Sequence, residues 1–193
     1  IGEEFEIVDN SSEYTWYIDP IDGTRSFVAG KSDFGTLIAL VKNKKIIGGV
    51  IDCPALQERW MSFDPETTIV NGKNTKCREI DKLENSVMAT TSSHEFGMEK
   101  WRAYQSLEAS VKVTTTGSDC YNYGLLANGY LDIVAEKLTA PHDYLPLIKI
   151  VQGAGGIMTD WEGNNLNFSD KNVYVLASSS NRLHELALEK LRA

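Results

Sequence analysis

The chain has 193 residues, of which 42% are hydrophobic and 24% are charged, and its formal net charge is −8 at pH 7. This negative charge argues against nucleic acid or an acidic membrane surface as a partner. No apolar run approaches the roughly 20 residues that a membrane-spanning helix requires. The three cysteines form no C-x-x-C pair, so we expect free thiols in a reducing compartment and a cytoplasmic location.

Short alternating or β-branched segments dominate the first part of the chain. They predict strands at residues 5–8, 15–18, 34–41, 46–51, 58–62 and 67–70. Residues 42–45 have the polar composition of a hairpin tip, and residues 25–30 are predicted to form a short helical turn. These consecutive strands predict an antiparallel meander.

The pattern changes near residue 80, where strands begin to alternate with longer helices. Strands are predicted at residues 86–90, 111–115, 131–135, 157–159 and 173–177. Helices are predicted at residues 97–110, 119–127, 143–152 and 181–191. Such alternation is typical of a sheet covered by helices. We therefore predict two lobes, an antiparallel-sheet lobe at residues 1–80 and an α/β lobe at residues 81–193.

The segment at residues 17–24 carries two acids at the predicted end of a strand. The strand is predicted to break into a turn that presents the carboxylates of Asp19 and Asp22, in a backbone restricted by Pro20. Like charges held this close raise each other's pKa unless a cation lies between them. The oxygen ligands suit a hard divalent metal, and Gly23 and Thr24 could offer backbone N–H groups to an anion. The alternative is an ordinary turn with solvated acids. The three histidines lack the spacing of a zinc site, so any metal is expected to be bound by oxygen.

Several motifs occur along the chain in an order that is found in one enzyme family. They are Gly2-Glu3-Glu4, Asp19-Pro20-Ile21-Asp22-Gly23-Thr24, Gly117-Ser118, Glu136, Asp143 and Ala154-Gly155-Gly156. In these motifs, which extend through most of the chain, the sequence resembles the inositol monophosphatase family of lithium-sensitive, Mg²⁺-dependent phosphatases. Two further segments resemble its histidinol-phosphatase branch, Arg25-Ser26-Phe27 and Gly117-Ser118-Asp119-Cys120-Tyr121. Inositol-type members more often carry Thr-Asn-Phe at the first of these segments.

The resemblance implies an α/β (α+β) fold, a layered αβαβα sandwich of the inositol monophosphatase and fructose-1,6-bisphosphatase type. Two features depart from the family pattern. His142 stands where the family usually has Trp before the last metal-binding Asp, and it could tune metal affinity, touch the substrate or only replace bulk. The two long helices that usually precede the Gly-Glu-Glu motif are not in this sequence. We therefore expect either a fragment or a first sheet that lacks the cover of one face.

The resemblance also implies a site for two or three Mg²⁺ ions. The implied metal ligands are Glu3, Asp19, the Ile21 carbonyl, Asp22 and Asp143. The implied catalytic groups are Glu3, Thr24 and Asp19. The implied substrate-binding residues are Gly23, Thr24, Ser118, Glu136 and Asp143. One ion would lower the pKa of a water that attacks phosphorus, with Thr24 orienting the water, and a second would bind a phosphate oxygen and the leaving group.

Each of these residues also has a simpler interpretation. Glu3 could be an exposed acid near the terminus, and Glu136 could be a solvated loop acid. Asp143 could be a helix N-cap as well as a ligand. Asp119 could contact a cationic substrate, although capping of its helix is the preferred interpretation, and Ser118 could be structural.

The sequence therefore predicts an Mg²⁺-dependent phosphomonoesterase that acts on a small phosphorylated metabolite. The preferred substrate is L-histidinol phosphate, which would place the protein in histidine biosynthesis, and the main alternative is myo-inositol 1-phosphate. The resemblance implies a homodimer. A non-catalytic, metal-stabilised binding module is the alternative from another class. Haloacid-dehalogenase-like phosphatases, which use an aspartyl nucleophile, fit poorly because one residue separates their two acids and two residues do so here.

Overall fold

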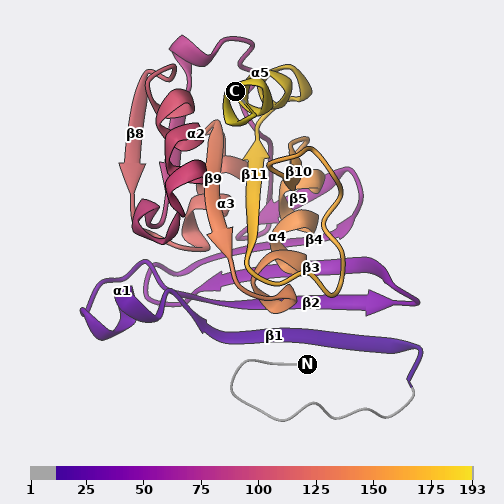
Figure 1. Ribbon diagram of the computed structural model, residues 1–193. Helices are drawn as coiled ribbons and strands as arrows, with labels where there is room; N and C mark the ends of the chain where they lie inside the picture. Colours follow the sequence, from indigo (N-terminus) through magenta and orange to yellow (C-terminus); the bar gives the residue numbers. More distant parts are fainter. Residues whose placement is uncertain (1–11, 193) are drawn as a thin grey trace.

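Residues 14–75 form the first of two β-sheets in the computed structural model, which describes residues 12–192. The strand predicted at residues 5–8 lies outside the described residues. The six strands of this sheet lie side by side in chain order, and each pair is antiparallel (Figure 1). They are β1 (Tyr14–Asp22), β2 (Gly35–Lys42), β3 (Lys45–Cys53), β4 (Glu58–Asp64), β5 (Thr67–Val70) and β6 (Lys73–Thr75). The predicted meander is thus observed, with β6 as a short polar addition that the sequence pattern did not indicate.

The second sheet is mixed and has the strand order β10-β11-β9-β7-β8. Its strands are β7 (Val87–Thr90), β8 (Val113–Thr116), β9 (Ile133–Leu138), β10 (Ile157–Asp160) and β11 (Val173–Ser178). β7 runs parallel to β8 and β9, whereas β11 runs antiparallel to β9 and β10. A parallel pair needs a crossover connection, and helices provide these connections here.

Helices separate and cover the two sheets. α3 (Tyr121–Ala127) contacts β3 and β9, and α4 (Pro141–Gly153) contacts β1 to β5 as well as β10, so both lie between the sheets. α2 (Met98–Glu108) packs on α5 (Asn181–Leu191), which contacts β11 (Figure 1). The short elements are α1 (Thr24–Val28) and the 3₁₀ helices η1 (Leu83–Asn85) and η2 (Ser93–Glu95). The described residues thus form successive β, α, β and α layers.

The alternation of side chains along the strands divides the hydrophobic core into two clusters. On β9, Val134 belongs to the cluster between the sheets, whereas Ile133 and Ala135 belong to the cluster under α2 and α5. This division follows because successive residues of a strand point to opposite faces. Fully buried side chains such as Leu37 and Ile133 each contribute roughly 1.5–3 kcal/mol of hydrophobic stabilisation.

The predicted turn at Asp19 is wrong. β1 continues through Pro20 to Asp22, and its pairing with β2 becomes irregular between Asp19 and Asp22. Within residues 12–192, β1 is an edge strand, where a proline without an N–H group is tolerated because no further described strand needs that donor. The irregular pairing, rather than a turn, places the two carboxylates at the end of the sheet.

The predicted fold class is confirmed, because the described chain is a mixed α and β structure with two sheets and five α-helices in layers. We keep the division into residues 1–80 and 81–193 as a proposal. The strands change sheet after β6, but the cluster between the sheets contains residues from both halves.

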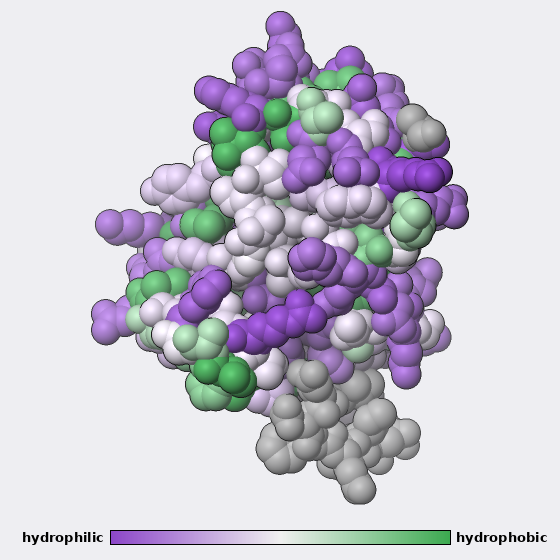
Figure 2. All heavy atoms as spheres, turned by 60° about the vertical axis from the view of Figure 1, so that its left-hand side comes forward, coloured by the Kyte–Doolittle hydropathy of each residue, from purple (hydrophilic) through white to green (hydrophobic). Residues whose placement is uncertain are grey.

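The surface of the molecule is mixed in character. On the face turned forward in Figure 2, hydrophilic residues surround a paler central area, and hydrophobic residues gather only in small patches. Within residues 12–192, no helix has both the length and the apolar character needed to cross a bilayer.

Candidate active site

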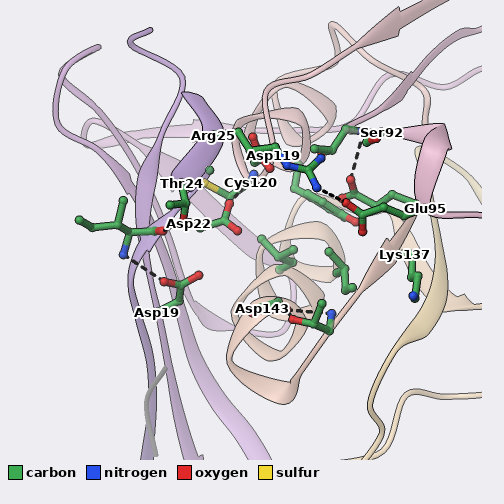
Figure 3. Close-up of a pocket in the computed structure, with 18 residues that line it drawn as sticks. Asp19, Asp22, Thr24, Arg25, Ser92, Glu95, Asp119, Cys120, Lys137 and Asp143 are labelled. Atoms are coloured by element: carbon green, nitrogen blue, oxygen red, sulfur yellow. Dashed lines mark hydrogen bonds and ion pairs between the residues drawn. The ribbon is translucent and has the colours of Figure 1, made fainter. Parts of the chain in front are cut away.

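A pocket of about 310 Å³ lies where the end of β1 meets the second sheet and α4. Its lining comes from four segments, which are residues 19–25, 91–95, 119–123 and 136–147 (Figure 3). The first segment belongs to the first sheet and α1, and the others belong to the second sheet and the helices beside it. The pocket therefore exists only when both sheets are in place.

Asp19 and Asp22 reach this pocket from the end of β1. Asp19 is 2% exposed, and its Oδ1 accepts a hydrogen bond of 3.0 Å from the backbone N–H of Ile21. The Oδ2 atom of Asp22 accepts a hydrogen bond of 2.7 Å from the N–H of Cys120, on the other side of the pocket. Burial raises the pKa of the Asp22 carboxyl well above its usual value, and the negative charges of Asp119 and Asp19 raise it further. A cation in the pocket would oppose this repulsion.

Gly23 and Thr24 form the junction between β1 and α1. Gly23 has φ of +80°, and a Cβ atom there would lie 3.3 Å from both the carbonyl oxygen of Asp33 and the Cα of Phe34. Both observations favour glycine at this position. Thr24 is the first residue of α1, and its hydroxyl donates a 3.2 Å hydrogen bond to the carbonyl of Ile21. The predicted partner of Thr24, Glu3, lies outside the described residues.

Asp143 stands in the first turn of α4 and also lines the pocket. Its Oδ2 atom accepts hydrogen bonds from the Thr139 N–H at 2.9 Å, the Thr139 hydroxyl at 2.7 Å and the Ala140 N–H at 3.0 Å. The interpretation of Asp143 as the N-cap is wrong, because the N-cap residue is Ala140. Asp143 is the third residue of the helix, and its side chain accepts a hydrogen bond from the backbone of the N-cap residue. The Nε2 atom of His142 lies 3.2 Å from the other carboxylate oxygen, Oδ1. His142 therefore contacts the predicted ligand directly.

Glu136 is a buried residue of β9 rather than a solvated loop acid. It is 2% exposed, and its Oε2 atom accepts a hydrogen bond of 3.2 Å from the N–H of Thr91. Its Oε1 atom has no hydrogen-bond partner among the described residues. Burial raises the pKa of Glu136 to about 7, although the contacts with Thr91 and Tyr123 lower it. The pocket thus contains a carboxyl group with one oxygen available to a ligand.

Ser118 and Asp119 occupy a loop with positive φ angles of 79° and 40°. Ser118 is not brought into the pocket lining, because its hydroxyl donates a 2.8 Å hydrogen bond to Asp33. Asp119 does line the pocket, and its predicted role as a helix cap is wrong, since α3 begins after Cys120. Burial raises the pKa of the Asp119 carboxyl, with further upward contributions from Asp33 and Glu95.

Several lining residues had no predicted role at the site. They are Arg25, Thr91, Ser92, Glu95, Tyr123 and Lys137. In the sequence, Arg25 belongs to a segment typical of one family branch, and the others lie outside the motifs named above. The contact between Thr91 and Glu136 spans 45 residues, so no local pattern could reveal it.

The described donors suit a hard cation, although they do not complete the predicted set. Asp19, Asp22 and Asp143 line one pocket, and carboxylate oxygens are the ligands that Mg²⁺ prefers. Within residues 12–192, no three Asp, Glu, His or Cys side chains are arranged to hold a metal by themselves. The fourth predicted carboxylate, that of Glu3, lies outside the described part of the chain. The chemistry of the donors therefore fits Mg²⁺, with Glu3 as the remaining expected ligand.

Comparisons with known proteins identify the family of the chain. A sequence model described as "Inositol monophosphatase family" matches residues 1–193. The chain is 41% identical over 198 residues to "Bifunctional phosphatase IMPL2, chloroplastic" of Arabidopsis thaliana, covering 98% of this chain and 57% of the relative. It is 31% identical to "Histidinol-phosphatase" of Chlorobaculum parvum, covering 84% of this chain and 63% of the relative. The chain thus spans about 60% of the length of these two curated relatives.

Solved structures show the same fold. An inositol monophosphatase from Zymomonas mobilis is 38% identical, with a TM-score of 0.89 over 94% of this chain and 72% of that one. The IMPase of Thermotoga maritima is 27% identical, with a TM-score of 0.86 over all of this chain and 73% of that one. Members of the matched family are phosphoric monoester hydrolases that in general depend on Mg²⁺. The chain belongs to the inositol monophosphatase family.

Proposed function

We propose that the protein hydrolyses the phosphate monoester of a small metabolite with the help of Mg²⁺. The observation that carries this proposal is the convergence of Asp19, Asp22 and Asp143 on one pocket, from residues far apart in the chain. Family membership supports the same chemistry. A purely structural metal site would not need the adjoining pocket or the ligand-accessible oxygen of Glu136.

In the proposed mechanism, Glu3, Asp19, Asp22, Asp143 and the Ile21 carbonyl hold two or three Mg²⁺ ions. Bound Mg²⁺ supplies a water of lowered pKa and neutralises charge on the phosphate. The chain's own groups orient and retain the reactants. Thr24, with Glu3 and Asp19, fixes the direction of the attacking water.

The substrate is held by groups on the other walls of the pocket. The N–H groups of Gly23 and Thr24 have no partner within α1 and bind phosphate oxygens, since the first turn of a helix leaves its N–H groups unpaired. Glu136 receives a hydroxyl or ammonium group of the alcohol part through its Oε1 atom. Ser118 supports the pocket through Asp33, and its direct contact with substrate stays a prediction.

We propose L-histidinol phosphate as the substrate, which implies a role in histidine biosynthesis. The segment Arg25-Ser26-Phe27 and the pocket carboxylate of Asp119 support this choice, as does the name of the Chlorobaculum relative. The alternative is myo-inositol 1-phosphate, and the Zymomonas structure favours it by name. We also propose a homodimer, by analogy with the family, and a reducing compartment such as the cytoplasm, because all three cysteines are free.

The experiment that tests the function compares kcat/KM for L-histidinol phosphate and myo-inositol 1-phosphate in the whole protein with excess Mg²⁺. We expect hydrolysis of both, with the higher value for L-histidinol phosphate. A higher value for myo-inositol 1-phosphate would replace the proposed substrate by its alternative. Absence of phosphate release from either compound would favour a non-catalytic binding module.

A further inference from the structure

An ion pair joins the two sides of the pocket mouth. Arg25, in α1, pairs with Glu95, which ends η2 after β7. Figure 3 shows the guanidinium group of Arg25 reaching across to Glu95. The two residues are 70 positions apart in the sequence, and both line the pocket. The ion pair therefore connects the part of the site that follows the first sheet with the part that belongs to the second sheet.

Two acids of the pocket interact with the guanidinium group. Glu95 forms the ion pair, and Asp119 lies close enough for its carboxyl group to respond to the charge of Arg25. Burial raises the pKa of the Asp119 carboxyl, and the nearby positive charge of Arg25 acts in the opposite direction. The positive charge of Arg25 at the pocket mouth therefore interacts with the carboxylates of both Glu95 and Asp119.

The pair can open without disturbing the fold. The side chains of Arg25 and Glu95 are 71% and 37% exposed, and ion pairs at such exposed positions contribute little to stability. The buried Glu136, by contrast, keeps one oxygen without a hydrogen bond among the described residues. A cationic ligand could therefore exchange with Arg25 at the mouth while its other polar groups satisfy Glu136.

We propose that Arg25 occupies, in the substrate-free protein, the place that the positive group of a cationic phosphomonoester takes, and that Glu95 with Asp119 recognises that group. This proposal rests on the phosphomonoesterase function and deepens it. It assigns to Glu95 the selection of amino-alcohol phosphates over uncharged polyol phosphates. It gives Arg25 the role of an internal competitor, which pairs with Glu95 and lies near Asp119 until such a substrate binds.

The test uses two phosphate monoesters, L-histidinol phosphate, whose alcohol part carries an ammonium group (the cationic substrate), and myo-inositol 1-phosphate, whose alcohol part is an uncharged polyol (the uncharged substrate). We compare the ratio of their kcat/KM values in the wild type, Glu95→Gln and Arg25→Ala. Glu95→Gln should lower the ratio of cationic to uncharged substrate roughly tenfold, mainly through KM, because a charge-assisted contact is lost. Arg25→Ala should raise the same ratio by about two- to fivefold, since the competing cation is removed.

The matched control is Glu162→Gln, which removes the exposed ion pair with Lys100 away from the pocket lining and should leave the ratio unchanged. Calorimetric binding of the two phosphomonoesters to the wild type and to Glu95→Gln gives a second measurement that does not need turnover. An unchanged or increased preference for the cationic compound in Glu95→Gln, in rate or in binding, would overturn the proposal. If the proposed phosphatase function is wrong, neither substrate will be hydrolysed, and this outcome can be distinguished from a wrong role for Glu95. In that case the ratio of the two binding affinities still tests the role of Glu95.

Discussion

Asp22 links the two sides of the site through a single side chain. It comes from β1, yet its Oδ2 atom accepts a hydrogen bond from the N–H of Cys120 in the loop before α3. Its carboxyl group also lies near the charges of Asp19 and Asp119. The position therefore combines a structural hydrogen bond with a negative charge, and the two contributions can be separated by substitution.

Asp22→Asn should reduce kcat by roughly a hundredfold or more while leaving the fold intact. Asparagine keeps the size of the side chain and an oxygen that can accept the Cys120 hydrogen bond, but it removes the charge expected to hold Mg²⁺. Steady-state kinetics at saturating Mg²⁺ measures the loss, and circular dichroism reports the fold.

The control for this variant is Asp52→Asn on β3. Asp52 is paired with Arg59 outside the proposed active site, so the substitution removes one surface charge without touching the predicted ligands. We expect activity close to that of the wild type. Near-normal turnover of Asp22→Asn would disprove the assignment of Asp22 as a metal ligand.

At the scale of elements, α4 is held against the first sheet by a close approach at Gly49. A Cβ atom at Gly49 of β3 would lie only 2.6 Å from the carbonyl oxygen of Pro146 in α4. Such a distance is shorter than any normal contact, so only glycine allows the helix to lie this near. Since Asp143 stands at the start of the same helix, the packing of α4 on β3 also sets the position of a predicted ligand.

The helix α5 carries a buried histidine that makes stability depend on pH. His184 is 3% exposed, and its ring nitrogens lie 2.8 Å from the Thr159 hydroxyl and 3.0 Å from the Ser178 hydroxyl. Burial lowers the pKa of His184 to about 4, and the charge of Arg192 contributes in the same direction. The folded protein therefore favours the neutral ring, whereas the unfolded chain protonates it near pH 6.5.

The free energy of unfolding should fall as the pH decreases from about 6.5 to about 4, because only the unfolded state binds the proton in that range. Protonation of His184 in the unfolded chain lowers the free energy of unfolding by about 3 kcal/mol between pH 6.5 and pH 4. Above pH 6.5 both states hold the neutral ring, and no stability is lost through this residue. His184→Gln should flatten this part of the pH profile relative to the wild type. Urea titrations between pH 4 and pH 7 measure the difference, and parallel profiles for the two proteins would contradict the prediction.

Elements with a clear local pattern could be predicted from the sequence, and their exact ends could not. The segment at residues 34–41, which is rich in β-forming residues, is observed as β2 at Gly35–Lys42. Pro20, in contrast, indicated a turn, because only the edge position of β1 among the described strands makes a proline compatible with the strand. β9 extends to Leu138 and thereby includes Glu136, since pairing with β11 continues beyond the apolar residues that predicted the strand.

At the scale of the molecule, the sequence predicted several residues that line the pocket, but it did not predict the contacts that join the two sides of the pocket. Asp19, Asp22 and Asp143 belong to motifs, and their convergence on one pocket agrees with the prediction. Arg25 and Glu95 form a contact across 70 residues, and such a contact follows from the meeting of two sheets rather than from any local pattern. The roles of Asp22, Arg25 and Glu95 are proposals that the variants above test.

The site takes its predicted ligands from both halves of the chain, so Mg²⁺ should stabilise both halves together. Asp19 and Asp22 belong to the first sheet, Asp143 belongs to α4, and the cluster between the sheets contains residues from both halves. We therefore expect one cooperative thermal transition, in spite of the proposed division near residue 80. At a concentration one hundred times its Kd, Mg²⁺ should add about 2.7 kcal/mol and raise Tm by about 5–10 °C.

Differential scanning calorimetry with excess Mg²⁺ and with a chelator measures this shift, and Asp22→Asn serves as the variant in which most of it should disappear. The shift should apply to the whole transition, because loss of the ions leaves carboxylates from both halves facing one another in the same pocket. Two separate transitions, of which Mg²⁺ moves only one, would show that residues 1–80 and 81–193 unfold independently. An equal shift in Asp22→Asn would instead place the stabilising ion elsewhere in the protein.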